Sequence, residues 1–224
     1  MTVFGSSSFL FGGAESRCVF SLFLRHHNLS EMLSNLKKYQ VVLASKSPRR
    51  QELLRGMGVD FTIQTKETDE SFPPDMPLDE VPKYLSQQKS LAFNLNELPA
   101  GFLLITADTV VICDDEILGK PKDRVEAVRM LEQLSGKAHH VVTGVTVRTA
   151  EKSESFSVKS EVTFAALETD EIDYYIDNYK PYDKAGAYGI QEWIGYVGIS
   201  GLEGSFYNVM GLPTRKLYNA LKGF

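Results

Sequence analysis

The sequence is poor in cysteine and has no excess of positive charge. Only two of its 224 residues are cysteines, Cys18 and Cys113, and they stand far apart in unlike contexts. They suggest neither a disulfide framework nor a paired-cysteine metal site, and we expect a reducing, cytoplasmic setting. The net charge is −5, which argues against the broad basic patch of a protein that binds nucleic acid.

Long apolar runs and the common nucleotide-binding loops are also missing. No apolar stretch reaches membrane-spanning length, so we expect no membrane partner. The chain has no P-loop and no Gly-x-Gly-x-x-Gly fingerprint, and its four histidines show no metal-ligand spacing. The sequence therefore gives no support to a common kinase or dinucleotide site.

The first 31 residues differ in composition from the rest of the chain. Residues 1–13 are rich in serine, phenylalanine and glycine, and residues 18–24 are apolar. The order of basic, apolar and cleavage regions that marks a signal peptide is absent. We expect residues 1–31 to be either a weakly ordered extension or no part of the natural product, with Met32 as its start in the second case, and residues 32–224 to form the functional domain.

Segments typical of strands and helices alternate along that domain. Strands are predicted at residues 39–44, 61–65, 102–112, 141–149, 155–167 and 196–199. Helices are predicted at residues 48–56, 78–95 and 212–221, with two more capped by Asp123 and Thr169. This alternation favours an α/β fold in which helices flank an elongated mixed sheet, with two lobes and a central cleft.

The run at residues 43–54 predicts a short strand that ends in a hydroxyl-rich turn and opens a helix. Ser47 is a good N-cap, and Pro48 suits the first helical position. Free backbone N–H groups at the helix start, together with the forked side chains of Arg49 and Arg50, favour phosphate binding. The alternative is that the two arginines form a solvated helix face.

Asp108 interrupts the apolar run at residues 103–112. A carboxylate there is costly unless it is paired or binds a metal, so a functional role is favoured over a backbone-bonded strand end. Lys120 follows in a Gly/Pro loop and can reach a phosphate chain, although such lysines are often only solvated.

The acidic segment at residues 67–70 offers a second carboxylate near Asp108 if the fold brings them together. Mg²⁺ is held by one or two carboxylates plus phosphate oxygens, which makes Glu70 and Asp108 sensible ligands. An exposed acidic loop is the alternative.

Six motifs follow one another from about residue 41 to the C-terminus: Ser45-Lys46-Ser47-Pro48-Arg49-Arg50, Ala107-Asp108-Thr109-Val110-Val111, Gly119-Lys120-Pro121, Leu134-Ser135-Gly136, Asp183-Lys184-Ala185-Gly186-Ala187-Tyr188-Gly189-Ile190-Gln191 and Val209-Met210-Gly211-Leu212-Pro213. Through these motifs the chain resembles the Maf family of nucleoside triphosphate pyrophosphatases over that range.

The resemblance implies hydrolysis of a nucleoside triphosphate to the monophosphate and pyrophosphate, with a divalent cation, Mg²⁺ or Mn²⁺. The Pro-Arg-Arg run and the later Lys-Ala-Gly-Ala-Tyr-Gly-Ile-Gln run are similar to the subgroup that favours dTTP and UTP. By motif matching, the catalytic residue would be Asp108, the metal ligands Glu70 and Asp108, and the substrate-binding residues Ser45, Arg49, Arg50, Lys89, Lys120 and Gln191.

Two other functions stay open at this point. A nucleotidyltransferase also needs a basic loop, an acid and a metal, but the sequence shows no motif for a second acceptor substrate. A non-catalytic, nucleotide-binding regulator of cell division would bind ligand without turnover. The expected partners are a nucleoside triphosphate and, as one form of assembly, a second copy of the chain in a homodimer.

Overall fold

The computed structural model describes residues 32–224, so the predicted extension at residues 1–31 lies outside the described residues. Within them, seven strands form one sheet in the order β2-β1-β3-β5-β6-β7, with β4 paired to β3. Strand β1 runs parallel to β2 and β3, and the other pairs are antiparallel. The predicted mixed sheet is therefore confirmed. The strands are β1 (Gln40–Leu43), β2 (Thr62–Ile63), β3 (Phe102–Cys113), β4 (Glu116–Leu118), β5 (Ala138–Arg148), β6 (Ser153–Phe164) and β7 (Ile199–Glu203).

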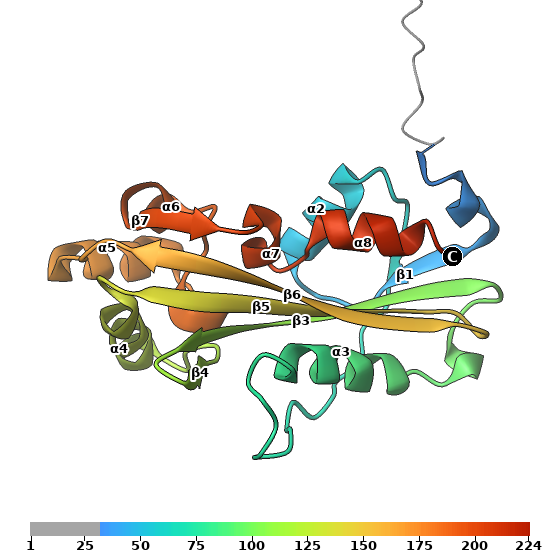
Figure 1. Cartoon of the computed structure of the whole chain (residues 1–224), viewed down its shortest axis with the longest axis horizontal. Helices are drawn as coiled ribbons and strands as arrows, with labels where there is room; N and C mark the ends of the chain where they lie inside the picture. Colours follow the sequence, from blue (N-terminus) through green and yellow to red (C-terminus); the bar gives the residue numbers. More distant parts are fainter. Residues whose placement is uncertain (1–31) are drawn as a thin grey trace, which may run out of the picture.

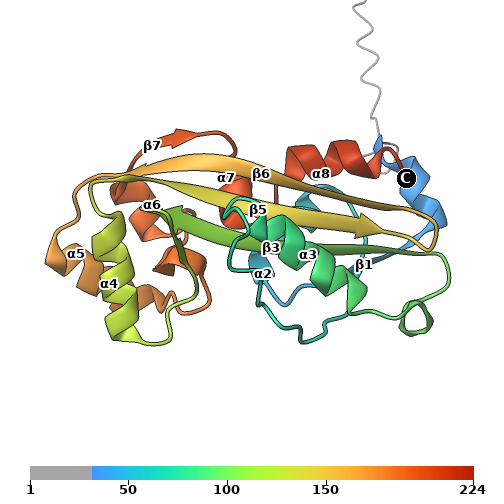
Figure 2. The same cartoon turned by 60° about the horizontal axis from the view of Figure 1, so that its bottom comes forward.

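Helices cover both faces of this sheet (Figures 1 and 2). The long strands β3, β5 and β6 run along the molecule, with α3 on one face and α2, α7 and α8 on the other, while α4 and α5 lie at one end. The helices are α2 (Pro48–Gly56), α3 (Val81–Leu91), α4 (Arg124–Leu134), α5 (Thr169–Tyr179), α6 (Trp193–Val197), α7 (Phe206–Met210) and α8 (Thr214–Leu221), with 3₁₀ turns at η1 (Ser34–Lys38), η2 (Leu95–Glu97) and η3 (Ala185–Ala187).

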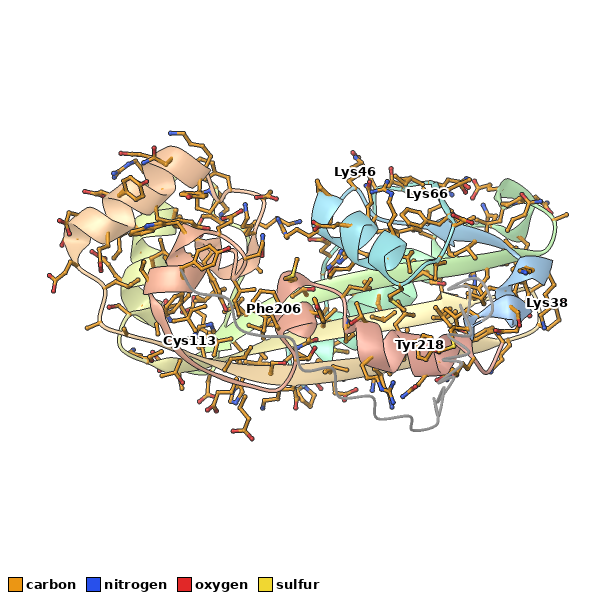
Figure 3. The ribbon with its side chains drawn as sticks, turned by 90° about the horizontal axis from the view of Figure 1, so that it is seen from above. Lys38, Lys46, Lys66, Cys113, Phe206 and Tyr218 are labelled. Carbon is orange, nitrogen blue, oxygen red and sulfur yellow. The ribbon has the colours of Figure 1, made fainter. Side chains whose placement is uncertain are left out.

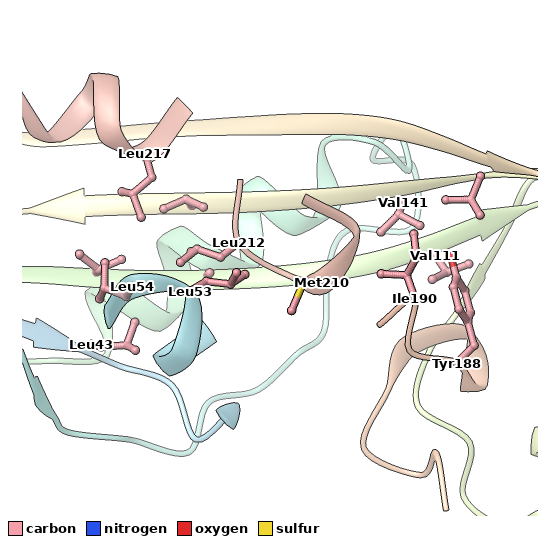
Figure 4. Packing of buried hydrophobic residues seen from close by; sticks show 14 of the residues in the cluster. Leu43, Leu53, Leu54, Val111, Val141, Tyr188, Ile190, Met210, Leu212 and Leu217 are labelled. Carbon is pink, nitrogen blue, oxygen red and sulfur yellow. The ribbon is translucent and has the colours of Figure 1, made fainter. Parts of the chain in front are cut away.

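The main hydrophobic core lies between the sheet and the helices of one face. Leu54 of α2, Leu212 and Leu217 of the C-terminal segment and Val141 of β5 are fully or almost fully buried in it (Figure 4). The opposite face has smaller clusters, one of which joins Val81 and Leu85 of α3 to the sheet. The sheet is thus buried on both faces, which explains why β3 is apolar almost throughout.

Two helix starts follow the sequence signals, and a third does not. The side-chain oxygens of Ser47 and Asp123 accept hydrogen bonds from the backbone N–H groups of Arg50 and Glu126, as expected for N-caps. The prediction that Thr169 caps α5 is wrong by one residue. Glu168 is the N-cap, in a reciprocal capping box with Glu171.

The strand predicted at residues 196–199 is also wrong, because α6 extends to Val197 and β7 begins only at Ile199. A short apolar run does not distinguish a strand from a helical turn. The predicted helix at residues 78–95 is shortened to α3, and the one at residues 212–221 begins at Thr214. The short elements β4 and α7 were not predicted.

No helix in the described range is long and apolar enough to cross a membrane.

A glycine in β5 allows α3 to approach the sheet closely. Gly144 pairs with Asp108 in the antiparallel ladder, and a Cβ atom at Gly144 would lie 2.2 Å from the carbonyl carbon and oxygen of Pro82, in the first turn of α3. Only glycine fits such a backbone contact. The close approach places α3 against the strand that carries Asp108.

Replacing Gly144 by alanine should therefore destabilise the protein. The methyl group has no space without displacement of α3, and overpacking of this kind costs about 1–3 kcal/mol. Urea unfolding of Gly144→Ala should show a clearly lower midpoint. The matched control is Gly56→Ala at the end of α2, where a Cβ would meet nothing within 4 Å. Equal midpoints for Gly144→Ala and the unmodified protein would contradict the close-packing argument.

Candidate active site

A cavity of about 950 Å³ lies at the centre of the molecule, where the C-terminal end of β1 and the start of α2 face the loop after α5. Seen from above, α7 with Phe206 lies between the group of elements around α2 and the group around α5 and α6 (Figure 3). The cavity is lined by all eight residues that the sequence analysis selected: Ser45, Arg49, Arg50, Glu70, Lys89, Asp108, Lys120 and Gln191. Residues that are distant in the sequence therefore converge on one cavity.

Arg50 is held by three acceptors on three different segments. Its Nε donates to the carbonyl of Gly211 (2.8 Å), Nη2 donates to Oγ1 of Thr109 (2.9 Å), and Nη1 donates to Oγ of Ser45 (3.5 Å). Burial lowers the pKa of Arg50, and the negative charge of Asp108 opposes that effect. Because all three acceptors are neutral, a fixed positive charge lines the cavity and can attract an anion.

Lys89 joins two of the carboxylates that line the cavity, those of Asp108 and Glu70. Its Nζ lies 2.5 Å from Oδ1 of Asp108 and 2.8 Å from Oε1 of Glu70. Asp108 is only 9% exposed, so its charge is compensated by this ion pair rather than by water. Partial burial opposes ionisation of Glu70, but the hydrogen bond and the charge of Lys89, together with the charges of Lys120 and Arg50, outweigh it, and the pKa of Glu70 falls below its usual value.

These two carboxylates suit a hard divalent cation. Both lie against one ammonium group, so a small cation near that position would meet oxygens from each. Mg²⁺ prefers such oxygens and takes its remaining ligands from water and phosphate. The described residues contain no cluster of three or more histidine, cysteine or acidic side chains that could hold a metal ion.

The loop after α5 forms the opposite wall of the cavity. Lys184 is buried there, and its Nζ lies 2.7 Å from Oδ1 of Asp183 and 3.1 Å from Oε1 of Glu192. Glu192 also accepts a hydrogen bond from the hydroxyl of Tyr175, which in turn accepts from the backbone N–H of Gly189 (3.0 Å). These contacts fix both ends of the segment that carries Gln191.

Tyr188 anchors the middle of the same loop in the core. Its hydroxyl lies 2.7 Å from Nε2 of His139, whose ring stacks on Phe164 at a centroid distance of 5.4 Å. Burial, with a smaller contribution from the charge of His140, lowers the pKa of His139 from 6.5 to about 4. His139 is therefore neutral in the folded protein near pH 7.

Stability should fall as the pH drops from about 6.5 to about 4. In that window the unfolded chain binds a proton at His139 and the folded protein does not, so acid favours unfolding. Once the pH is well below the pKa of the folded state, the gap between 6.5 and about 4 corresponds to a loss of about 3 kcal/mol in the free energy of unfolding. Urea titrations at several pH values should show a smaller pH dependence for His139→Phe than for the unmodified protein. The control is His140→Asn, which changes the partly exposed neighbouring histidine. If the free energy of unfolding of His139→Phe depends on pH as strongly as that of the unmodified protein, His139 is not the group responsible.

Several cavity residues received no role from the sequence. Thr109 and Gly211 orient Arg50, Asp183 links the loop after α5 to Arg49 of α2, and Lys184 pairs with Asp183 within that loop. A hydroxyl beside Asp108 in an apolar strand, and an adjacent acid and base before a small-residue loop, are sequence signals that could have identified Thr109, Asp183 and Lys184. Neither signal identifies the partner, because each partner lies far away in the sequence.

The chain from residue 40 to residue 224 matches the family model described as "Maf-like protein". A protein from Bacteroides thetaiotaomicron named dTTP/UTP pyrophosphatase is 54% identical over 192 residues, covering 85% of this chain and 99% of the relative. Relatives with the same name occur in Porphyromonas gingivalis (54% identical, 86% of this chain and 98% of the relative) and Flavobacterium psychrophilum (46%, 81% and 94%).

Proposed function

Since this chain belongs to the Maf family, we propose that it hydrolyses nucleoside triphosphates, above all dTTP and UTP, to the nucleoside monophosphate and pyrophosphate. The family predicted from the six motifs is confirmed by the match over residues 40–224. The single observation that carries the proposal is that Arg49, Arg50 and Lys120 line the same cavity as the Asp108–Lys89 pair. Positive charge there suits a triphosphate, and the acid suits activation of water.

The reaction is an attack of water on the α-phosphorus. A new bond forms from the water oxygen to phosphorus, the bond from phosphorus to the bridging oxygen breaks, and pyrophosphate leaves with that electron pair. Asp108 orients the water and accepts its proton, while Lys89 keeps the carboxylate in place at 2.5 Å. Arg49, Arg50 and Lys120 offset the negative charge that grows on the phosphate oxygens.

Glu70 and Asp108 would hold a divalent cation, Mg²⁺ or Mn²⁺. Bound there, the cation would supply charge neutralisation for the phosphate oxygens. Lys89 would share the two carboxylates with it, so that the negative charge of Asp108 and Glu70 stays compensated before and after binding.

Gln191 is the residue that we assign to the base. It lines the main cavity and also a smaller hollow of about 410 Å³, whose walls include Phe206 and Tyr207. These partly exposed rings and the amide together suit a flat base with carbonyl groups at its edge. The arginines contact phosphates that every nucleotide shares, so selection among bases falls to this region.

A panel of nucleotides tests the proposed specificity. We expect kcat/KM for dTTP and UTP to exceed that for dATP and dGTP by at least about tenfold, because a wrong base leaves polar groups unpaired. The variant Gln191→Ala should lose most of that preference while it still releases pyrophosphate. Equal cleavage of all bases, or a preference for 7-methyl-GTP, would contradict the proposed substrate class.

A further inference from the structure

An ion pair crosses the cavity between its two walls. Nη1 of Arg49, in the first turn of α2, lies 2.9 Å from Oδ2 of Asp183, in the loop after α5. Both residues line the cavity. The side chain of Asp183 is 55% exposed and that of Arg49 is 20% exposed, so the contact lies where solvent and ligands can reach it.

The position of Asp183 is unusual for a cavity that attracts a polyanion. Although burial opposes its ionisation, hydrogen bonds from Lys184 and Arg49 lower the pKa of Asp183 below its usual value. A fixed negative charge at this place repels the phosphates of a substrate, so the presence of Asp183 calls for a separate role. Like-charge contacts of this kind weaken binding.

Neutralising Lys184 does not require Asp183. Lys184 is 7% exposed and keeps a second carboxylate, Oε1 of Glu192, at 3.1 Å. Glu192 is itself held by the hydroxyl of Tyr175. The loop therefore has its own internal support, and the contact of Asp183 with Arg49 is an additional link to α2.

We propose that Asp183 is a positioning residue that takes the place of a phosphate group on Arg49 when the cavity is empty, and that it competes with the triphosphate and with pyrophosphate for this arginine. The inference rests on the proposed function through the role given to Arg49. In this arrangement Asp183 keeps the guanidinium aligned across the cavity, yields it to the incoming substrate, and recovers it as pyrophosphate departs. Asp183 thus limits affinity and favours release of product.

Kinetics of Asp183→Asn with dTTP test the competition. The amide keeps the size of the side chain but removes its charge, so we expect KM and the inhibition constant of pyrophosphate each to fall by about two- to fivefold, the scale of a partly exposed ion pair. The value of kcat should not rise. In an Arg49→Gln background the same change should have no effect, because the guanidinium group for which Asp183 and the phosphates compete is absent.

The matched control is Asp177→Asn, which removes a comparable exposed ion pair with Arg124 (3.2 Å) outside the cavity and should leave both constants unchanged. If Asp183→Asn lowers expression, Asp183→Ser tests the same loss of charge. An unchanged or increased KM in a folded variant would overturn the proposal and leave Asp183 as a structural support.

Calorimetric binding of inorganic pyrophosphate separates this inference from the proposed function. If the unmodified protein does not hydrolyse any nucleotide, the proposed function fails, yet tighter pyrophosphate binding by Asp183→Asn would still support the competition. Normal hydrolysis by the unmodified protein, with equal pyrophosphate affinity in both proteins, would overturn the inference alone.

Discussion

The variant Asp108→Asn should lose about 10²- to 10⁴-fold in kcat, the usual scale for a general acid–base group. Asparagine keeps the size of the side chain and can stay beside Lys89, but it cannot accept the proton of the attacking water. Its neutral amide also offers a weaker ligand to a divalent cation. Steady-state release of pyrophosphate from dTTP measures the change.

Binding separates a chemical role of Asp108 from a structural one. The phosphate contacts assigned to Arg49, Arg50 and Lys120 are unaffected by the change, so the affinity for dTTP should fall much less than kcat does. Asp114→Asn is a matched control, because it breaks a lysine–aspartate pair on the surface, with Lys137 at 2.6 Å. A nearly normal kcat in folded Asp108→Asn would exclude Asp108 as the catalytic residue.

The variant Arg50→Lys should reduce kcat/KM by about 10²- to 10³-fold, the effect of losing one preorganised donor at a developing negative charge. Lysine keeps the positive charge but lacks the planar fork. It cannot contact Gly211, Thr109 and Ser45 in the geometry that Arg50 uses. The kinetic constants for dTTP, together with the thermal midpoint, distinguish loss of catalysis from loss of folding.

The neighbouring arginine provides the comparison for that experiment. Arg49 makes a single ion pair with Asp183 at the cavity wall, and a lysine in its place can still reach a phosphate. Arg49→Lys should therefore cost no more than about tenfold in kcat/KM. If the two variants lose activity equally, the rigid support of Arg50 is not what makes it important.

Local chemistry explains which parts of the site were predictable. Ser47 and Pro48 specify a helix start within a few residues, and that start places Arg49 and Arg50 at the cavity. Asp108 was conspicuous because a carboxylate rarely lies inside an apolar strand. Such signals do not depend on the rest of the fold, so a single sequence carries them.

The contacts between distant segments could not be predicted in this way. Nothing near Gly144 in the sequence indicates that α3 packs on it, and nothing near Asp183 indicates Arg49 as its partner. The error at residues 196–199 has a related cause. A run of four residues has no clear periodicity, and the pairing of β7 with β6 fixes the strand a few residues later.

Hydrolysis of dTTP in water enriched in oxygen-18 tests the central claim most directly. Attack at the α-phosphorus predicts that the label appears in dTMP, that pyrophosphate is released without label, and that no acceptor other than water is needed. Mass spectrometry and phosphorus NMR would identify both products. Label in pyrophosphate, release of orthophosphate with dTDP, or tight binding without turnover would contradict the account, and the last of these would favour a nucleotide-binding regulator.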